Sequence, residues 1–305
     1  FCLKTLKKVS NVSFVPNISV IIPVKNEGTH IKTTLDSLFS VRTRRDFEVI
    51  VVDDASTDGC CDFLQDEPYR KNGQVVLCRT EGIGAANARN LGAEKASGEY
   101  FVFCDAHMLF ADGWLDLLLE PLEKKLTDAT TPAIGSVNNP EFTGYGQTLK
   151  FNLRIKWNDK QNRLFETAVL PGACFAVPRK VFTDAGGFER GFKTWGYEDI
   201  EFSIKMWLFG YRCHCRPDVK VLHLFRKAQP YEINREEIYY NLMRMAYSHF
   251  NNSRIEKCRK IIGRKMAAPI EKEVIRDGVL RQRKQYFKTR KHTDDWYFQK
   301  FNIHF

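Results

Sequence analysis

Residues 100–107 have the sequence Tyr100-Phe-Val-Phe-Cys-Asp-Ala-His107, an apolar run that ends in an aspartate and a histidine. Five apolar positions in succession predict a strand that is buried on both faces, which is typical of a parallel sheet. Asp105 and His107 are one residue apart, so in an extended chain their side chains point to the same side. A carboxylate oxygen and an imidazole nitrogen suit Mn²⁺, and also Mg²⁺ or Zn²⁺.

Three similar apolar runs precede this one, at residues 18–24, 47–52 and 75–78. Helical patterns lie between them, with Thr29 expected to cap the first helix and a short helix expected at residues 60–64. Strands that alternate with helices predict an α/β fold with a parallel sheet and helices on both faces. Ligands of such sheets bind at the carboxyl ends of the strands, so a nucleotide site is expected there.

Polar residues near these strand ends are candidates for that site. Asp53 and Asp54 close the second run and can bind a base or ribose, or cap a turn, a role that Asp58 can fill instead. Arg89 precedes the fourth strand on a predicted helix. It can contact a diphosphate, support Asp105, or form an ordinary surface ion pair.

A third metal ligand is expected from residues 221–226, which have the sequence VLHLFR. A lone histidine in an apolar run is more often a core residue, but His223 completes a coherent set with Asp105 and His107. Arg226 is a candidate for binding a phosphate oxygen. A divalent ion at such a site can neutralise charge on a departing diphosphate.

A second constellation is Trp195-Gly-Tyr-Glu-Asp199. An aromatic face such as Trp195 can stack on a sugar, and the Glu198 and Asp199 carboxylates can hold its hydroxyl groups. One of them can also accept a proton from an attacking acceptor. The alternative is a helix start, where acidic residues are favoured by the helix dipole.

The nine cysteines include no CxxC pair and several lie in apolar runs, which predicts reduced thiols and a cytoplasmic location. Neighbouring strand residues point to opposite faces, so residues 213–215, Cys-His-Cys, are interpreted as structural rather than as a zinc site.

No apolar stretch is long enough for a membrane span. Residues 1–17 lack the pattern of a signal peptide.

The positive charge is concentrated in residues 230–305, which hold 17 Lys/Arg against 9 Asp/Glu. Their pattern predicts a basic helical C-terminal extension with a solvated face or a face for an acidic partner. Its aromatic residues fit no nucleic-acid recognition module, so no nucleic-acid partner is expected. Residues 1–229 are expected to form the main domain, with a donor half at about 17–110 and an acceptor half at about 111–229. The oligomeric state is left open.

Four motifs, in this order, resemble family 2 glycosyltransferases of the GT-A fold. They are ISVIIPVKNE at 18–27, VVDDASTD at 51–58, residues 88–90 with GEYFVFCDAH at 98–107, and GGFERGFKTWGYED at 186–199. The DAH motif (a DxH pattern) combined with the later HLFR is similar to the polypeptide N-acetylgalactosaminyltransferases and their bacterial relatives. The resemblance implies a Rossmann-like, mostly parallel sheet flanked by helices.

The resemblance also implies a UDP-sugar donor and assigns roles to residues. The nucleoside pocket would be lined by Pro23, Val24, Glu27 and Asp54. Mn²⁺ would be held against the diphosphate by Asp105, His107 and His223, with help from Arg226. Glu198 would bind hydroxyl groups of donor or acceptor, and Asp199 would be the acceptor base.

One departure from the N-acetylgalactosaminyltransferases concerns stereochemistry. Those retaining enzymes carry Glu-Asn where this chain has Glu198-Asp199, a pair typical of inverting relatives, so inversion is expected. A lectin domain such as those enzymes append is not expected. The acceptor is expected to be a peptide Ser, Thr or Cys, with a cell-wall, capsular or lipid-linked glycan as the alternative. A hypothesis of another class is a catalytically silent nucleotide-sugar-binding protein.

Overall fold

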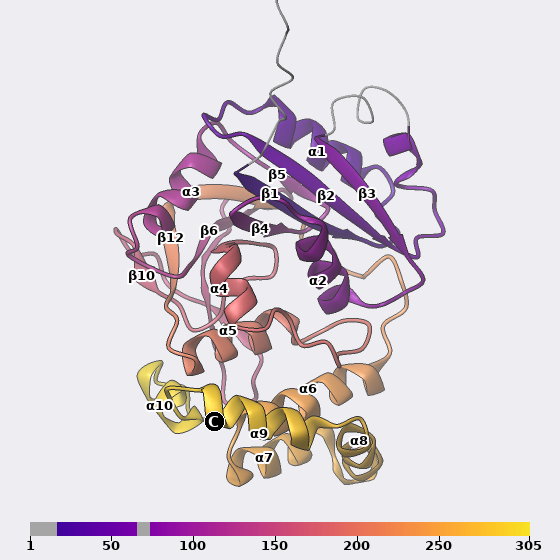
Figure 1. The fold of residues 1–305 in the computed structure, drawn as a ribbon, viewed down its shortest axis with the longest axis vertical. Coiled ribbons are helices and arrows are strands. Elements are labelled where there is room, and N and C mark those ends of the chain that lie inside the picture. The colour runs from indigo at the N-terminus through magenta and orange to yellow at the C-terminus, as the bar shows by residue number, and fades with distance from the viewer. Residues whose placement is uncertain (1–16, 66–73) are drawn as a thin grey trace, which may run out of the picture.

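The computed structural model describes residues 17–65 and 74–305, so residues 1–16, where a signal peptide was considered, lie outside them. Within these ranges a ten-stranded sheet has the order β10-β12-β6-β11-β4-β1-β2-β3, with β5 added beside β12 and β7 beside β6 (Figure 1). Its strands are β1 (Ile18–Val24), β2 (Phe47–Asp54), β3 (Val75–Thr80), β4 (Tyr100–Cys104), β5 (Met108–Leu109), β6 (Ala129–Ser136), β7 (Thr143–Tyr145), β10 (Phe165–Glu166), β11 (Cys174–Pro178) and β12 (Cys213–His223). A separate hairpin pairs β8 (Gln147–Leu149) with β9 (Ile155–Trp157).

The first four strands confirm the predicted parallel half of the sheet. β1 lies between β2 and β4 and is parallel to both, and β3 extends the sheet beyond β2. β2 and β3 each continue two residues beyond the predicted runs, to Asp54 and Thr80. The carboxyl ends of β1, β2 and β4 therefore meet at one edge of the sheet.

The other half of the sheet is mixed rather than parallel throughout. β11 runs antiparallel to both β4 and β6, while β12 is parallel to β6. β11 lies between β4 and β6 in the sheet, although it follows both of them in the chain. The sheet is mostly parallel, as expected, but this insertion could not be read from apolar runs alone.

Helices cover both faces of the sheet (Figure 1). One face is covered by α1 (His30–Ser40) and α3 (Trp114–Glu123), and the other by α2 (Ala85–Lys95), α4 (Arg179–Asp184) and α5 (Glu198–Leu208). The strands supply both cores by alternation: Phe101 and Phe103 join one core, whereas Val102 joins the opposite one. This two-sided burial explains the unbroken apolar runs in the sequence.

Two local predictions need correction. Thr29 occupies the N-cap position of α1, but its side chain makes no capping bond because its backbone is already helical rather than extended. The short helix expected at 60–64 is a 3₁₀ helix, η1 (Asp62–Gln65). Glu198 and Asp199 form the first turn of α5, so the helix start considered as the alternative for this segment is present.

The C-terminal extension is helical, as predicted, and packs against the main domain (Figure 1). It consists of α6 (Arg235–His249), α7 (Asn252–Ile262), α8 (Arg264–Arg276), α9 (Val279–Thr289) and α10 (Asp294–Lys300). Its side chains share one continuous core with α5 and the sheet; Tyr297, for example, is fully buried and donates a hydrogen bond to the Ala168 carbonyl at 3.0 Å.

Buried charges join α5 to α6. The Lys205 ammonium lies 3.2 Å from Glu201 and donates to the Gly187 carbonyl at 2.6 Å, while His249 Nε2 lies 2.7 Å from the other Glu201 oxygen. All three charged or titratable side chains are at most 1% exposed. The Lys205 ammonium, both Glu201 oxygens and His249 Nε2 all have partners, so these buried contacts link the extension to α5.

Lys205→Met is expected to lower the free energy of unfolding by about 3–5 kcal/mol, because Glu201 would lose its buried counter-charge. Urea denaturation measures this change in the free energy of unfolding, provided that the slope of the free energy against urea concentration is the same in both proteins. Lys180→Met is the matched control, since Lys180 forms an exposed pair with Asp184 at the same spacing of four residues. That loss should stay below about 1 kcal/mol, and equal losses in the two variants would contradict a buried-charge effect.

Eight cysteines fall within the described residues, and all eight are free thiols. Cys213 and Cys215 are buried on one side of β12, while His214 faces the other side and bonds Thr127, so the structural interpretation of residues 213–215 is supported. Among the described helices, none combines the length and apolar character that crossing a lipid bilayer requires.

Candidate functional site

The three predicted metal ligands are brought together by the pairing of β5 with β12. Asp105 and His107 follow β4, and β5 begins directly after His107. β5 pairs antiparallel with the end of β12, so that His223 lies opposite Met108. The Leu224 N–H then donates to the His107 carbonyl at 3.1 Å. A two-residue strand thus joins two histidines that are 116 positions apart in the sequence.

The ligand atoms of this cluster all lie within 4.8 Å of one another. The Nε2 atoms of His107 and His223 are 3.1 Å apart, and His223 Nε2 is 3.4 Å from an Asp105 oxygen. Two ligands of one ion, at bond lengths of about 2.1 Å and angles between right and tetrahedral, are separated by about 3.0–3.4 Å. The donor set therefore fits a divalent cation.

The electrostatics keep Asp105 ready to bind a cation. Burial alone would raise the pKa of Asp105, but the hydrogen bond with His223 and the positive charge of Arg89 outweigh it and lower the pKa to about 2. Arg89 is itself buried and donates to Asp105 at 3.0 Å. Of the roles considered for Arg89, the structure shows support of Asp105.

Glu27 fixes the orientation of His107. Its carboxylate lies 3.1 Å from His107 Nδ1 and also binds Arg226 through both guanidinium nitrogens. Burial would raise the pKa of Glu27, but the bonds from His107 and Arg226 lower it, so the group is ionised and can only accept hydrogen bonds. His107 Nδ1 therefore donates to Glu27, and the Nε2 atom of His107 is directed towards the cluster.

The Trp195–Asp199 segment is held in a turn that only unusual backbone angles allow. Gly196 and Tyr197 have φ values of +102° and +68°, and the latter is rare outside glycine. The turn starts α5 so that Glu198 accepts from the Gly196 N–H at 2.8 Å and lies 3.4 Å from Arg89. A strained residue held by its surroundings next to buried acids is typical of a functional site.

Asp199 is a carboxyl group oriented by two backbone amides. Its oxygens accept hydrogen bonds from the N–H groups of Ile200 at 2.8 Å and Gly172 at 3.2 Å. Burial and the negative charge of Glu198 raise the pKa of Asp199 to about 7. A carboxyl group with this pKa can accept a proton near neutral pH.

The residues expected to line a nucleoside pocket lie on one wall of the same cavity. Pro23 and Val24 end β1, and Asp54 ends β2. The Asp54 carboxylate accepts hydrogen bonds from Thr80 at 2.5 Å and from the N–H groups of Ile83 and Gly84. It therefore fixes the loop after β3, and its oxygens are already engaged in this structure.

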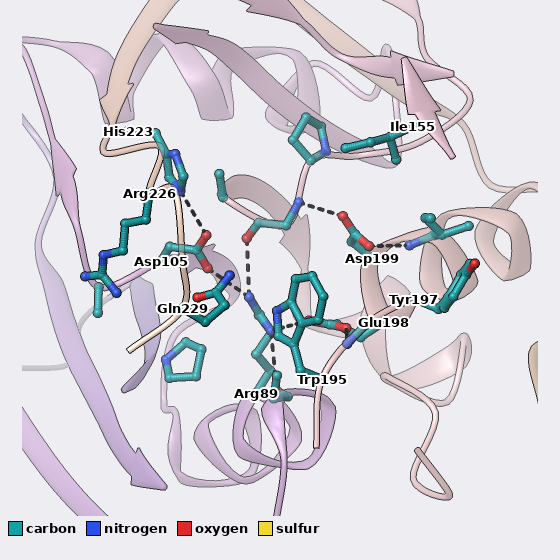
Figure 2. A pocket seen from close by; sticks show the side chains of 18 of the residues that line it. Arg89, Asp105, Ile155, Trp195, Tyr197, Glu198, Asp199, His223, Arg226 and Gln229 are labelled. Atoms are coloured by element: carbon teal, nitrogen blue, oxygen red, sulfur yellow. Dashed lines mark hydrogen bonds and ion pairs between the residues drawn. The ribbon is translucent and has the colours of Figure 1, made fainter. Parts of the chain in front are cut away.

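All twelve predicted site residues line a cavity of about 740 Å³: Pro23, Val24, Glu27, Asp54, Arg89, Asp105, His107, Trp195, Glu198, Asp199, His223 and Arg226. Figure 2 shows His223, Asp105 and Arg226 on one side of it, with Asp199 and Tyr197 on the other. That these side chains lie together is confirmed by the structure. Their roles in binding and catalysis stay predictions.

Sequence reasoning missed part of this cavity. The β8–β9 hairpin contributes Gln147, Lys150, Arg154, Ile155 and Trp157 to its wall. The signal available was the segment QTLKFNLRIKWN at 147–158, which has exposed aromatic and basic residues but no acid. Its strands are only three residues long, too short for a clear alternation pattern.

Solved structures define the class of fold. The crystal structure of GalNAc-T7 with UDP, GalNAc and Mn²⁺ superposes with a TM-score of 0.75 over 95% of this chain and 57% of that chain, at 21% identity. Staphylococcus aureus TarS in complex with UDP-GlcNAc has a TM-score of 0.59, at 18% identity over 83% of this chain and 73% of that chain. The fold is that of the GT-A glycosyltransferases.

Sequence comparison defines the family. The model described as glycosyl transferase family 2 matches residues 19–186, more than half of the chain, and that of the N-terminal domain of galactosyltransferase matches residues 157–228. The chain belongs to glycosyltransferase family 2.

Curated relatives include polypeptide N-acetylgalactosaminyltransferases from animals. The chain is 33% identical over 230 residues to polypeptide N-acetylgalactosaminyltransferase 8 of Drosophila melanogaster, which covers 70% of this chain and 38% of the relative. It is 32% identical over 243 residues to polypeptide N-acetylgalactosaminyltransferase 3 of Mus musculus, covering 71% and 38%. The chain thus spans about two fifths of the length of these relatives.

Proposed function

We propose that the chain transfers a sugar from a UDP-sugar to a peptide acceptor, with inversion at the anomeric carbon, in the presence of Mn²⁺ or Mg²⁺. The observation that carries this proposal is the convergence of Asp105, His107 and His223 in one cavity with Asp199. The names of the relatives, polypeptide N-acetylgalactosaminyltransferases, support a peptide acceptor, and the solved structures with UDP or UDP-GlcNAc bound support a UDP-sugar donor. A divalent ion bound at the three ligands would supply electrostatic neutralisation of the departing diphosphate.

The residues on the donor side bind the UDP-sugar and orient it. In the proposal Pro23 and Val24 contact the nucleoside with Asp54 near the base, and Arg226 assists at the diphosphate after exchanging one of its bonds to Glu27. Arg89 holds Asp105 in place. The donor half is formed by residues 17–110 and the acceptor half by 111–229, while 230–305 support the acceptor half from outside.

The residues on the acceptor side move the proton. Trp195 offers an aromatic face to a sugar, and Glu198 accepts hydrogen bonds from hydroxyl groups. As the acceptor oxygen bonds to the anomeric carbon and the bond from that carbon to the diphosphate breaks, the acceptor proton passes to Asp199. The amides of Gly172 and Ile200 keep the Asp199 carboxylate oriented for this transfer.

The test is release of UDP from a panel of UDP-sugars with Mn²⁺, Mg²⁺ or EDTA. Metal-dependent release from at least one donor is expected, followed by mass spectrometry of candidate Ser, Thr or Cys peptides and NMR of the new anomeric bond. A catalytically silent binding protein would bind UDP-sugars but would not cleave them, so no UDP would be released. If neither metal-dependent binding nor release occurs, the proposal is wrong. The cytoplasmic location expected from the free thiols is part of the proposal.

The activity should rise with pH through about 7. Asp199 must be ionised to accept a proton, and its pKa is raised to about 7 by burial and by Glu198. Below that pH kcat/KM should fall about tenfold per unit, and above it the profile should level off. Measuring kcat/KM from pH 5.5 to 8.5 at saturating metal gives the profile.

Glu198→Gln separates this effect from protonation of the imidazole ligands, which also weakens metal binding at low pH. The substitution removes the negative charge beside Asp199. The rising part of the plot of kcat/KM against pH should therefore move to lower pH, even if the maximal value of kcat/KM falls. If the rising part of the profile stays at the same pH, a group other than Asp199 causes it.

A further inference from the structure

The β8–β9 hairpin presents an open strand edge to the cavity. β8 is paired on both sides, with β9 and through Gln147 with Val169. β9 is paired only with β8 within the described part of the chain. An open edge with unpaired N–H and C=O groups is a template for one more strand.

The register shows which backbone groups face the open side. Lys150 N donates to Arg154 O, and Asn158 N donates to Gly146 O. Hydrogen-bonded pairs alternate in an antiparallel ladder, so Thr148 and Lys156 form the pair between them. Ile155 and Trp157 therefore direct their N–H and C=O groups away from β8, and no residue in the described ranges bonds to those groups.

The hairpin is also strongly basic. Residues 147–158 contain Lys150, Arg154 and Lys156 but no aspartate or glutamate. All three cations are exposed, and none forms an ion pair with the described residues. Lys150 and Arg154 line the cavity, whereas Lys156 is not among its lining residues. The cavity side thus holds two positive charges without a counter-charge.

The Ile155 end of this edge lies on the side of Asp199. Figure 2 shows Ile155 on the same side as Asp199 and Tyr197, away from His223 and Arg226. The pKa of Tyr197 is raised to about 12, chiefly by burial, and the nearby positive charge of Arg154 acts against that rise. At the other end of β9, the Trp157 ring packs against Phe225, whose ring contacts that of His223.

We propose that β9 binds the acceptor as an extended peptide strand, and that Lys150 and Arg154 select acidic residues next to the residue that is glycosylated. This inference rests on the proposed function and names its substrate class. Alternating N–H and C=O groups at a strand edge match a peptide backbone, which a glycan does not possess. The two unpaired cations supply the charge preference.

The first experiment compares Ser/Thr peptides whose flanking residues are acidic, neutral or basic, with UDP-sugar and Mn²⁺ present. Acidic flanks should raise kcat/KM about fivefold over neutral ones, the size that exposed ion pairs support, and added salt should reduce the ratio. N-methylation of the peptide backbone should weaken binding about tenfold at every second residue and little at the residues between.

The second experiment reverses charges on the hairpin. Arg154→Glu and Lys150→Glu should each shift the preference from acidic towards basic peptides. Lys156→Glu makes the same charge change at a residue that does not line the cavity, and it should alter the preference less than twofold. Peptide binding is also measured directly, by fluorescence anisotropy of labelled peptides in the presence of UDP and Mn²⁺.

The outcomes separate this inference from the proposed function. If UDP is released and acidic, neutral and basic peptides react equally well, the inference is overturned and the proposed function stands. Transfer to a glycan only would overturn both the inference and the peptide acceptor of the proposed function. A uniform effect of N-methylation overturns strand addition. Absence of UDP release contradicts the proposed function, and the anisotropy measurement then decides whether the hairpin still binds acidic peptides.

Discussion

Replacing Asp199 by Asn is expected to reduce kcat by about 10²–10⁴-fold while the dissociation constant of UDP stays nearly unchanged. Asparagine keeps the size of the side chain and can still accept a hydrogen bond from Ile200 or Gly172, but it cannot take up the acceptor proton. Steady-state transfer, with UDP binding measured by calorimetry, separates the two quantities.

Asp184→Asn is the control for this substitution. Asp184 lies at the end of α4, where it pairs with Lys180 at 2.6 Å and does not line the cavity. Its replacement should leave kcat within about twofold. A fully active Asp199→Asn enzyme would instead indicate retention of configuration, or a different base such as Glu198.

Replacing His223 by Ala should weaken UDP binding in the presence of Mn²⁺ by at least about 10–100-fold, the loss that even the supporting residues of metal sites produce. His107→Ala should have the same effect, because the Nε2 atoms of both histidines face the same position in the ligand cluster. In EDTA, wild type and variants should bind UDP equally weakly. Calorimetric titration with and without Mn²⁺ measures these values.

His214→Ala serves as the matched control, since His214 lies on the same strand but bonds Thr127 outside the cavity. It should bind UDP like the wild type. Unchanged Mn²⁺-dependent binding after loss of either His107 or His223 would show that the ligands are assigned wrongly.

The sequence predicted the parallel half of the fold because its strands are buried on both faces. Residues 18–24 and 100–104 are continuous apolar runs, and such runs have few alternatives. The antiparallel β11 was not predicted, since its apolar pattern does not reveal which strands it enters between. The hairpin of β8 and β9 was missed because each of its strands has only three residues.

The candidate site was predictable to the extent that its residues follow strands. Asp105, His107 and His223 end apolar runs, and the structure brings them together. The supporting contacts were not predictable, because they join distant segments: Glu27 with His107 and Arg226, and Arg89 with Glu198. Lys205 illustrates the same limit, since a glutamate four residues before a lysine usually marks a solvated helix face rather than a buried pair.

The short contact between β5 and β12 couples ligand binding to folding. Its residues come from positions more than a hundred apart, so an unfolded chain does not present the three ligands together. Whatever occupies the cluster therefore binds the native state alone and raises the melting temperature in proportion to the logarithm of its concentration. A thermal shift with metal would thus report that residues 105–107 and residue 223 have reached their native positions together.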